Sequence, residues 1–468
     1  MTAISATTPR RSSELRLLLF AVLIAMATYA TVELAHNERV TGGVLAYGGA
    51  LAALFIGAHV AIRRLAPAAD PVLLPIAAVL NGLGLVVIHR LDLAAQDRAR
   101  QFGSAPPDAL APLQLAWTAV GLVLFVGVLA LIRDHRTLDR YRYTFVAVAL
   151  GLILLPAVLP ARFSELNGAR IWVRVAGFSI QPAEFGKLAL IVFFASYLVA
   201  KREVLSLATR RVLGFTLPRA RDLGPVLTAW LVSLALLIRE RDLGSSLLFF
   251  GIFIVMLYIA TERTSWLLIG VGLFLVGTIA AYQLFGHVQV RVETWLDPFA
   301  DAGNRGFQLT QGLFGLATGG LTGTGLGLGQ PEAVPYAATD FIFDAIGEEL
   351  GLIGLVAVLV LFLLLVSRGM RVGLGVRDDF GKLLAGGLAF AVALQVFVVV
   401  GGVTRLIPLT GITLPFVSYG GSSLVANYAL VALLLRVSDA GRNTPPVEPV
   451  RAGAAAELGD DTTQVVHP

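Results

Sequence analysis

Two ionisable residues stand inside an apolar stretch of the sequence. Glu184 and Lys187 are three residues apart in QPAEFGKLAL. Helical geometry places positions i and i+3 on one face, where opposite charges neutralise each other. Charged groups at membrane depth are costly, so both residues are candidates for function. Two interpretations are open: a structural ion pair that joins helices, or a Lys187 that meets an anionic group of a substrate.

A basic and aromatic segment precedes this pair. The sequence NGARIWVR contains Arg170, Trp172 and Arg174. A tryptophan by itself is an ordinary anchor at the membrane surface. The arginines add positive charge on the side of the membrane where basic anchors are not expected, and guanidinium groups bind phosphate oxygens well. The segment is therefore predicted to bind a phosphate-bearing lipid headgroup.

Further charges occur in RERDLGSS, which contains Glu240, Arg241 and Asp242 between two short apolar runs. Short, glycine-interrupted helices can leave polar backbone lining a cavity. A compact outer turn with solvated charges explains the same residues equally well. Both interpretations stay open at this point.

A long glycine-rich segment from about 285 to 349 carries many acids and few bases. Its carboxylates could coordinate a divalent cation or act as a general base. A carboxylate is ionised at neutral pH and can accept a proton from a sugar hydroxyl during glycosyl transfer. Composition does not choose among the charged residues, which are Arg291, Glu293, Asp297, Asp301, Asp340, Asp344, Glu348 and Glu349.

Two other motifs do not indicate chemistry. The run Gly323 to Gly329 resembles a dinucleotide-binding loop, but no strand precedes it, so we interpret it as a turn or close-packing segment. The run Ser418 to Ser423 offers hydroxyls without a nearby histidine base, which argues against a serine nucleophile. Its small residues are predicted to allow close approach of helices.

The elements that must position these residues are membrane helices. The chain has 468 residues, of which 56% are hydrophobic and 14% charged, whereas soluble domains carry about 25% charged residues. This composition excludes soluble enzyme folds for most of the chain. We predict an all-α polytopic membrane protein with about twelve spans, at residues 15–35, 43–62, 71–88, 112–132, 143–160, 182–200, 223–239, 244–260, 264–284, 350–367, 382–403 and 414–436.

The distribution of lysine and arginine predicts the orientation. With the N-terminus inside, the inner segments hold 23 of these 36 residues and the outer segments 12, as expected for cytoplasmic termini. The segment 285–349 is then extracytoplasmic, and its many aromatic residues indicate a folded structure rather than a flexible linker. The tail 438–468 has no periodicity and is predicted to be disordered.

Composition also limits the chemistry. The chain contains no cysteine and only six scattered histidines, which argues against Cys/His zinc sites, thiol redox chemistry and disulfide frameworks. The net charge of +5 is explained by cytoplasmic basic residues of a bilayer protein. We therefore expect no nucleic-acid partner.

Five blocks in order resemble the SEDS (shape, elongation, division and sporulation) family, of the RodA and FtsW type. The resemblance covers roughly residues 71–437, after an additional two-helix region at 1–70 that is typical of the longer actinobacterial members of the RodA type. The blocks are NGARIWVRVAGFSIQPAEFGKL, DLGSS, RVETWLDPFADAGNRGFQLTQG, TDFIFDAIGEELGLIG and PLTGITLPFVSYGGSSL.

The resemblance implies roles for particular residues. The essential acid of the family ends a P-x-x-D block, which here places Asp301 as the catalytic base and makes Asp297 a weaker candidate. The chain departs from the family pattern at Ala183, where serine is usual, at Ile171, where a basic residue is usual, and at the additional acid Asp344. Residues assigned to substrate binding are Arg170, Trp172, Gln181, Glu184, Lys187, Asp340, Glu348, Ser418 and Ser422.

The same resemblance implies an activity and partners. It indicates a peptidoglycan glycosyltransferase of the bacterial plasma membrane that polymerises lipid II for cell-wall elongation, working with a class B penicillin-binding protein and membrane lipid. A divalent cation, Mg²⁺ or Mn²⁺, could assist the leaving group. The alternatives are a lipid II flippase, which needs charge along its path but no outer base, and a non-catalytic scaffold, for which changes at Asp301 would be harmless.

Overall fold

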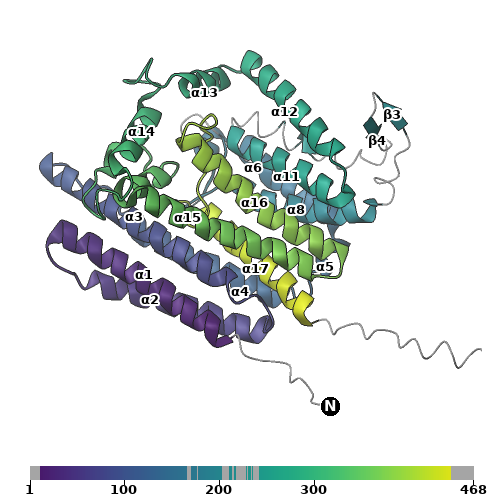
Figure 1. Ribbon diagram of the computed structural model, residues 1–468, viewed down its shortest axis with the longest axis horizontal. Coiled ribbons are helices and arrows are strands. Elements are labelled where there is room, and N and C mark those ends of the chain that lie inside the picture. Colours follow the sequence, from purple (N-terminus) through teal and green to yellow (C-terminus); the bar gives the residue numbers. More distant parts are fainter. Residues whose placement is uncertain are drawn as a thin grey trace, which may run out of the picture.

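The computed structural model is a bundle of long helices with very little sheet (Figure 1). It describes residues 11–165, 170–175, 178–202 and 242–443, with short stretches at 210–212, 215–217, 228, 230–232 and 235. Two small antiparallel hairpins occur, β1 (Val173–Val175) with β2 (Phe178–Ile180) and β3 (Arg210–Val212) with β4 (Phe215–Leu217). The predicted all-α polytopic class is confirmed.

The long helices of the described residues follow the predicted apolar runs, and shorter helices lie between them. They are α1 (Arg11–Asn37), α2 (Gly43–Leu65), α3 (Leu73–Gln101), α4 (Leu110–Leu131), α5 (Thr137–Arg140), α6 (Arg142–Val158), α7 (Ala161–Ser164), α8 (Pro182–Ala200), α11 (Leu243–Thr261), α12 (Ser265–Leu284), α13 (Gly286–Leu296), α14 (Phe307–Gly319), the 3-10 turn η1 (Pro331–Ala333), α15 (Ile342–Gly375), α16 (Asp379–Val403) and α17 (Gly421–Asn443).

Ten helices in the described part of the chain are long and apolar enough to cross a membrane, and α6 is a shorter apolar helix. Eleven of the twelve predicted spans therefore coincide with a helix. The twelfth, at 223–239, falls mostly outside the described residues. Helices α3, α8 and α17 form the centre of the bundle, whereas only 6% of the apolar window of α12 is buried. An apolar helix with so little protein cover presents its side chains to lipid.

The structure corrects several predicted boundaries; the span predicted at 71–88 is a helix that continues to Gln101. Helix α15 begins at Ile342, and the predicted start of this span at 350 coincides instead with a kink at Gly351, where φ is +63°. Helix α17 begins at Gly421 rather than at 414, because the apolar segment before it is a buried loop in which Phe416 has φ of +64°. It ends at Asn443, so residues 438–443 are helical rather than part of a disordered tail.

The segment 285–349 is folded, as its aromatic content predicts. It contains α13, α14 and η1, and its glycine run packs closely against the start of α15. Gly323 has φ of +83°, and a Cβ there would lie 2.2 Å from the carbonyl oxygen of Glu349. Only glycine tolerates both conditions. The interpretation of Gly323 to Gly329 as a close-packing segment is confirmed.

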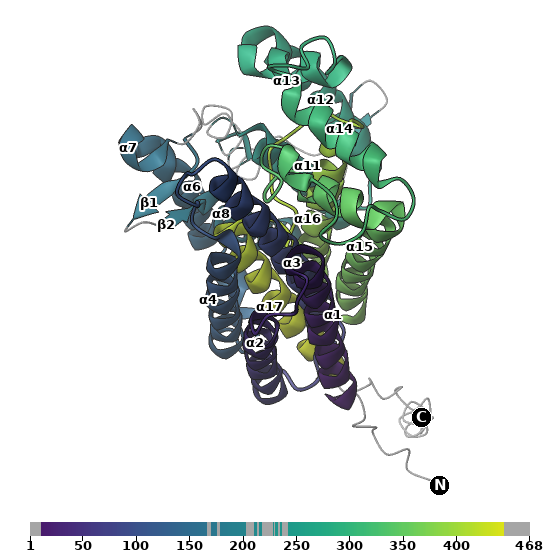
Figure 2. The same cartoon turned by 90° about the vertical axis from the view of Figure 1, so that its left-hand side faces the viewer.

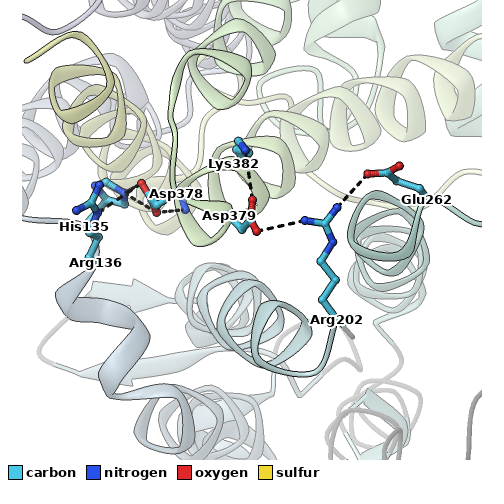
Figure 3. Close-up of polar contacts among 8 residues, drawn as sticks. His135, Arg136, Arg202, Glu262, Asp378, Asp379 and Lys382 are labelled. Atoms are coloured by element: carbon cyan, nitrogen blue, oxygen red, sulfur yellow. Dashed lines mark hydrogen bonds and ion pairs between the residues drawn. The ribbon is translucent and has the colours of Figure 1, made fainter. Parts of the chain in front are cut away.

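One end of the bundle carries several ion pairs between loops and helix ends. The start of α1 and the end of α17 lie at the same end (Figure 2), where Arg442 pairs with Asp70 at 2.6 Å. At that end, His135 contacts Asp378 at 2.9 Å, and Arg202 joins Asp379 and Glu262 at 3.2 and 3.1 Å (Figure 3). These pairs tie loops together where positively charged, cytoplasmic connections are expected. The segment 285–349 occupies the opposite end (Figure 2).

Candidate functional site

The first turn of α8 holds a buried ion pair. Pro182 occupies the start of the helix, and Glu184 lies in its first turn, where the helix dipole favours negative charge. The ammonium of Lys187 donates to Glu184 Oε2 at 2.8 Å and to Gln395 Oε1 at 2.9 Å. The Lys187 side chain is only 2% exposed. The predicted i,i+3 pair is confirmed, and in this structure it also joins α8 to α16.

Gln395 is a functional residue that the sequence analysis missed. It is a lone amide in the middle of α16, 1% exposed, and its Nε2 donates to the carbonyl oxygen of Thr413 at 2.9 Å. The amide thus connects the ion pair of α8 to the loop before α17. A single polar residue in the interior of the apolar run 382–403, after Lys382 at its start, was the available signal, because buried polar groups in membrane helices need partners.

Asp242 joins α8 to α11. Its Oδ1 accepts from the backbone N–H of Ser245 at 2.9 Å and caps α11, while Oδ2 accepts from Gln181 Nε2 at 3.4 Å. Burial raises the pKa of Asp242, the negative charge of Glu184 adds to this effect, and the positive charge of Arg291 opposes it. The interpretation of RERDLGSS as a turn with solvated charges is therefore wrong for Asp242, which is buried. Glu240 and Arg241 lie outside the described residues.

Arg291 and Asp340 both lie beside Gly411 in the loop before α17. The guanidinium of Arg291, on α13, donates to the carbonyl oxygens of Leu409 and Thr410 at 3.0 and 2.9 Å. A Cβ on Gly411 would lie 3.6 Å from Asp340 Oδ2 and 3.9 Å from Arg291 Nη2, so both side chains border this glycine, whose φ is +76°. The left-handed backbone therefore favours glycine here, whereas a Cβ would make only ordinary contacts with the two side chains.

Burial controls the charge states of this pair. It raises the pKa of Asp340 to about 6, although a hydrogen bond with Thr339 and the charge of Arg291 oppose the shift. Burial lowers the pKa of Arg291, and the carboxylates of Asp242 and Asp340 oppose that shift. A carboxyl group whose pKa approaches neutrality beside a cation is typical of functional sites. We call the residues Gln181, Glu184, Lys187, Asp242, Arg291, Asp340 and Gln395 the polar cluster.

The predicted serines position the polar cluster. The hydroxyl of Ser418 donates to the carbonyl oxygen of Thr339 at 2.6 Å and accepts from the N–H of Leu414 at 2.8 Å. Ser422 Oγ accepts from the backbone N–H of Gln181 at 2.8 Å. Both are at most 4% exposed. Ser418 thereby fixes the residue next to Asp340, and Ser422 fixes the start of α8.

Asp301 lies on an exposed turn between α13 and α14. Its Oδ2 accepts from the N–H of Arg305 at 3.3 Å, and its carbonyl oxygen accepts from Asn304 and Gly306. Asp297 is also exposed, but its Oδ1 accepts from the N–H groups of Phe299 and Ala300 at 3.1 and 3.2 Å. Asp297 thus holds the turn, while Asp301 presents its carboxylate to the surroundings.

This turn is attached to the loop that covers the polar cluster. Arg405 Nε donates to the carbonyl oxygen of Trp295 at 2.8 Å, and Trp295 Nε1 donates to the carbonyl oxygen of Arg405 at 3.1 Å. Arg405 also donates to Leu296. Asp301 follows Leu296 by five residues, and five residues span at most about 18 Å. The hydrogen bonds of the described residues do not join Asp301 directly to Lys187.

Three other predicted residues lie apart from the polar cluster. Arg170 is exposed and pairs with Glu165 at 3.2 Å. The backbone N–H of Trp172 donates to the carbonyl oxygen of Ser164. Residues 166–169 lie outside the described part. Glu348 Oε1 accepts from the N–H of Gln330 at 2.6 Å and holds the glycine-rich segment. Glu348 therefore has a structural partner in the outer segment.

The acids do not converge on a metal site. In the ranges that the structure describes, no group of three or more His, Cys, Asp or Glu residues is arranged to hold a metal ion. Asp242 and Asp340 have the cation Arg291 near both of them. Asp344 is buried, and neither carboxylate oxygen finds a partner within the described part. The acids of the described ranges therefore do not fit a divalent cation.

The comparisons with known proteins agree with the described features. The family model of FtsW, RodA and SpoVE cell cycle proteins matches residues 71–443. The peptidoglycan glycosyltransferase RodA of Mycobacterium tuberculosis (strain ATCC 25618 / H37Rv) is 50% identical over 457 residues, which cover 98% of this chain and 96% of that protein.

Two solved structures resemble the fold. A chain from a study of "structural coordination of polymerization and crosslinking by a peptidoglycan synthase complex" has a TM-score of 0.63 at 28% identity, and the match covers 81% of this chain and 99% of that one. The rod shape determining protein RodA of Thermus thermophilus has a TM-score of 0.55 at 25% identity, with 79% and 97% covered.

Proposed function

The chain belongs to the FtsW, RodA and SpoVE family of cell cycle proteins, and we propose that it polymerises lipid II into glycan strands for cell-wall elongation. The glycosyltransferase activity itself follows from 50% identity, over nearly the full length, to a curated peptidoglycan glycosyltransferase. The structural observation that carries the site assignment is the exposed Asp301 turn, attached through Arg405 to the loop over the buried polar cluster.

In the proposed reaction, Asp301 accepts the proton from the 4-hydroxyl of an acceptor GlcNAc. That oxygen attacks the anomeric carbon of a second lipid-linked chain, and the bond from this carbon to the pyrophosphate oxygen breaks. Polyprenyl pyrophosphate leaves with the bonding electrons, and one displacement inverts the anomeric carbon. The exposed position of Asp301, with a single backbone donor on Oδ2, supports its role as the base.

The leaving pyrophosphate needs positive charge. Arg291 belongs to the polar cluster and lies near Asp340. Arg170 lies outside the cluster and is exposed with one exposed partner. Either guanidinium can donate paired hydrogen bonds to phosphate oxygens. Lys187 is buried and neutralised by Glu184, so it adds little net charge to the site. We assign the pyrophosphate to one of these two guanidiniums, Arg291 or Arg170, and to Lys187 the positioning of α8 on α16.

Membrane placement and partner complete the proposal. The chain is a multi-pass membrane protein. We place both termini in the cytoplasm and the segment 285–349 outside, supported by the bias of lysine and arginine. The similarity to a chain of a peptidoglycan synthase complex supports a class B penicillin-binding protein as partner.

The test is polymerisation of purified lipid II by the detergent-solubilised chain with its class B partner. We expect Asp301→Asn to abolish glycan polymer at equal amounts of folded protein. The matched control is Asp297→Asn, whose amide oxygen can still accept from Phe299 and Ala300 and which should polymerise. Normal amounts of polymer from Asp301→Asn would refute the assignment of Asp301 as the general base. No polymer from the wild-type complex favours the flippase or the scaffold.

A further inference from the structure

The first two helices precede the segment that the family model matches. The match begins at residue 71, whereas α1 and α2 span Arg11–Asn37 and Gly43–Leu65. Helix α1 runs beside α3 (Figure 1). Its second half reaches the end of the bundle at which the segment 285–349 lies (Figure 2). The hairpin of α1 and α2 is therefore placed to contact the outer segment.

That contact is made by the glycine-rich segment 319–330. A Cβ on Gly327 would lie 2.9 Å from Ala35 Cβ and 3.4 Å from the carbonyl oxygen of Val32, so this glycine packs directly on α1. Leu326 packs against a small apolar cluster that α1, α2 and α3 share. The cluster consists of Tyr29, Val32, Val44 and Val86. The segment rests on the hairpin through its backbone as well as through a side chain.

A polar connection runs beside this apolar one. Glu33 of α1 is 3% exposed and lies 2.8 Å from His89 Nε2, and the ring of Tyr29 stacks on His89 at 4.3 Å. The next residue on α3, Arg90, is 4% exposed and faces the outer segment. Its guanidinium donates to Glu349 Oε1 at 3.0 Å and to the carbonyl oxygen of Gly329 at 2.7 Å. Adjacent residues of α3 thus bind α1 and the glycine-rich segment.

The segment 319–330 follows α14 and is hydrogen-bonded to α15. Thr324 and Gly325 donate their N–H groups to the carbonyl oxygens of Glu348 and Glu349, each at 3.0 Å. Helix α14 ends where this segment starts, and a Cβ on Gly319 would lie 2.0 Å from the carbonyl oxygen of Gly347. The turn that carries Asp301 leads directly into α14. A shift of the segment would therefore act on the end of the helix whose start adjoins the Asp301 turn.

We propose that the α1–α2 hairpin is a positioning element of the glycosyltransferase site. It supports the segment 319–330 and thereby holds α14 and the Asp301 turn in place relative to the polar cluster. The proposal rests on the proposed function, since it takes Asp301 as the base. Misplacement of a reacting group by about 1 Å can cost roughly 10²-fold in rate, so the support has a kinetic consequence.

The test variant is Gly327→Ala, which drives a Cβ against Ala35 at a left-handed position. Gly103→Ala is the matched control, because Gly103 also has positive φ, at +62°, but a Cβ there meets no atom within 4 Å. With the full chain and its class B partner, we expect Gly327→Ala to lower kcat for lipid II about tenfold at unchanged KM. Adding Ala35→Gly removes the opposing Cβ and should restore kcat.

A distance measurement tests the positioning without using activity. The chain has no cysteine, so Gly303→Cys on the Asp301 turn and Leu406→Cys on the loop before α17 accept two spin labels uniquely. Both sites are exposed. We expect Gly327→Ala to broaden or shift the label distance, Gly103→Ala to leave it unchanged, and Ala35→Gly to restore it. If Gly327→Ala fails to fold, Leu326→Ala weakens the same contact without backbone strain.

The outcomes separate this proposal from the base assignment. If Gly327→Ala has the same kcat and label distance as Gly103→Ala, the positioning role is overturned. It is also overturned if adding Ala35→Gly to Gly327→Ala does not restore kcat and the label distance. Normal polymerisation by Asp301→Asn overturns the base assignment, while the label distances still report whether the hairpin holds the turn. A matched loss of kcat and of folded protein in both glycine variants would show only general destabilisation and overturn the proposal.

Discussion

The ion pair of Lys187 with Glu184 gives the sharpest test of how the polar cluster is held together. Both side chains are nearly inaccessible, at 2% and 10% exposure. Replacing Lys187 by methionine leaves the Glu184 carboxylate buried without its cation, and breaking a buried pair in this way costs about 3–5 kcal/mol. We therefore expect Lys187→Met to lower the free energy of unfolding by that amount.

Removing both charges has a smaller expected effect. In Lys187→Met combined with Glu184→Gln no charge is left unpaired, and neutral replacement of a buried pair is often tolerated. Gln395 Oε1 loses the donor that it has at 2.9 Å, and an unsatisfied buried acceptor costs about 1–3 kcal/mol. The double variant should thus be about 2 kcal/mol more stable than Lys187→Met.

The assay is reversible unfolding in mixed detergent micelles, together with lipid II polymerisation by the folded fraction. If the pair only joins α8 to α16, the double variant regains stability and polymerises. A double variant no more stable than Lys187→Met refutes the compensation argument. A stable double variant that makes no polymer shows that Lys187 itself meets the anionic substrate, and the assignment of the pyrophosphate to Arg291 or Arg170 is then wrong.

Two further predictions concern Asp340 of the polar cluster and Ser418 in the loop before α17. Burial raises the pKa of Asp340 from 3.8 to about 6. The folded state therefore binds more protons than the unfolded state between these values, so stability falls as pH rises from about 4 to 6 and levels off above. Asp340→Asn should remove this slope in thermal unfolding at pH 4.5 and 7, and an unchanged slope contradicts the assignment. Ser418→Ala leaves the N–H of Leu414 and the carbonyl of Thr339 without their partner. It should cost about 1–3 kcal/mol and slow polymerisation, whereas Ser367→Ala, on an exposed part of α15, should do neither.

Local patterns in the sequence predicted the helices and the pair Glu184 and Lys187. Apolar runs long enough to cross a bilayer are sufficient to place a helix, because backbone groups in lipid must bond within their own segment. The spacing of three residues brings two side chains together whatever the rest of the fold does. The same holds for the glycine run, where several left-handed positions required glycine. Helix ends were less predictable, since α15 begins eight residues before its expected span.

The sequence by itself determined a helical membrane protein, the block that contains Asp301, and the local pairing at the start of α8. Only the tertiary structure decided that Gln395, more than 200 residues away, binds that pair, and that Arg291 and Asp340 both lie beside Gly411. The tertiary structure also decided that the hydroxyls of Ser418 and Ser422 form hydrogen bonds with backbone groups. Such contacts depend on which helix faces lie against each other, which packing of the whole bundle sets and no local period encodes.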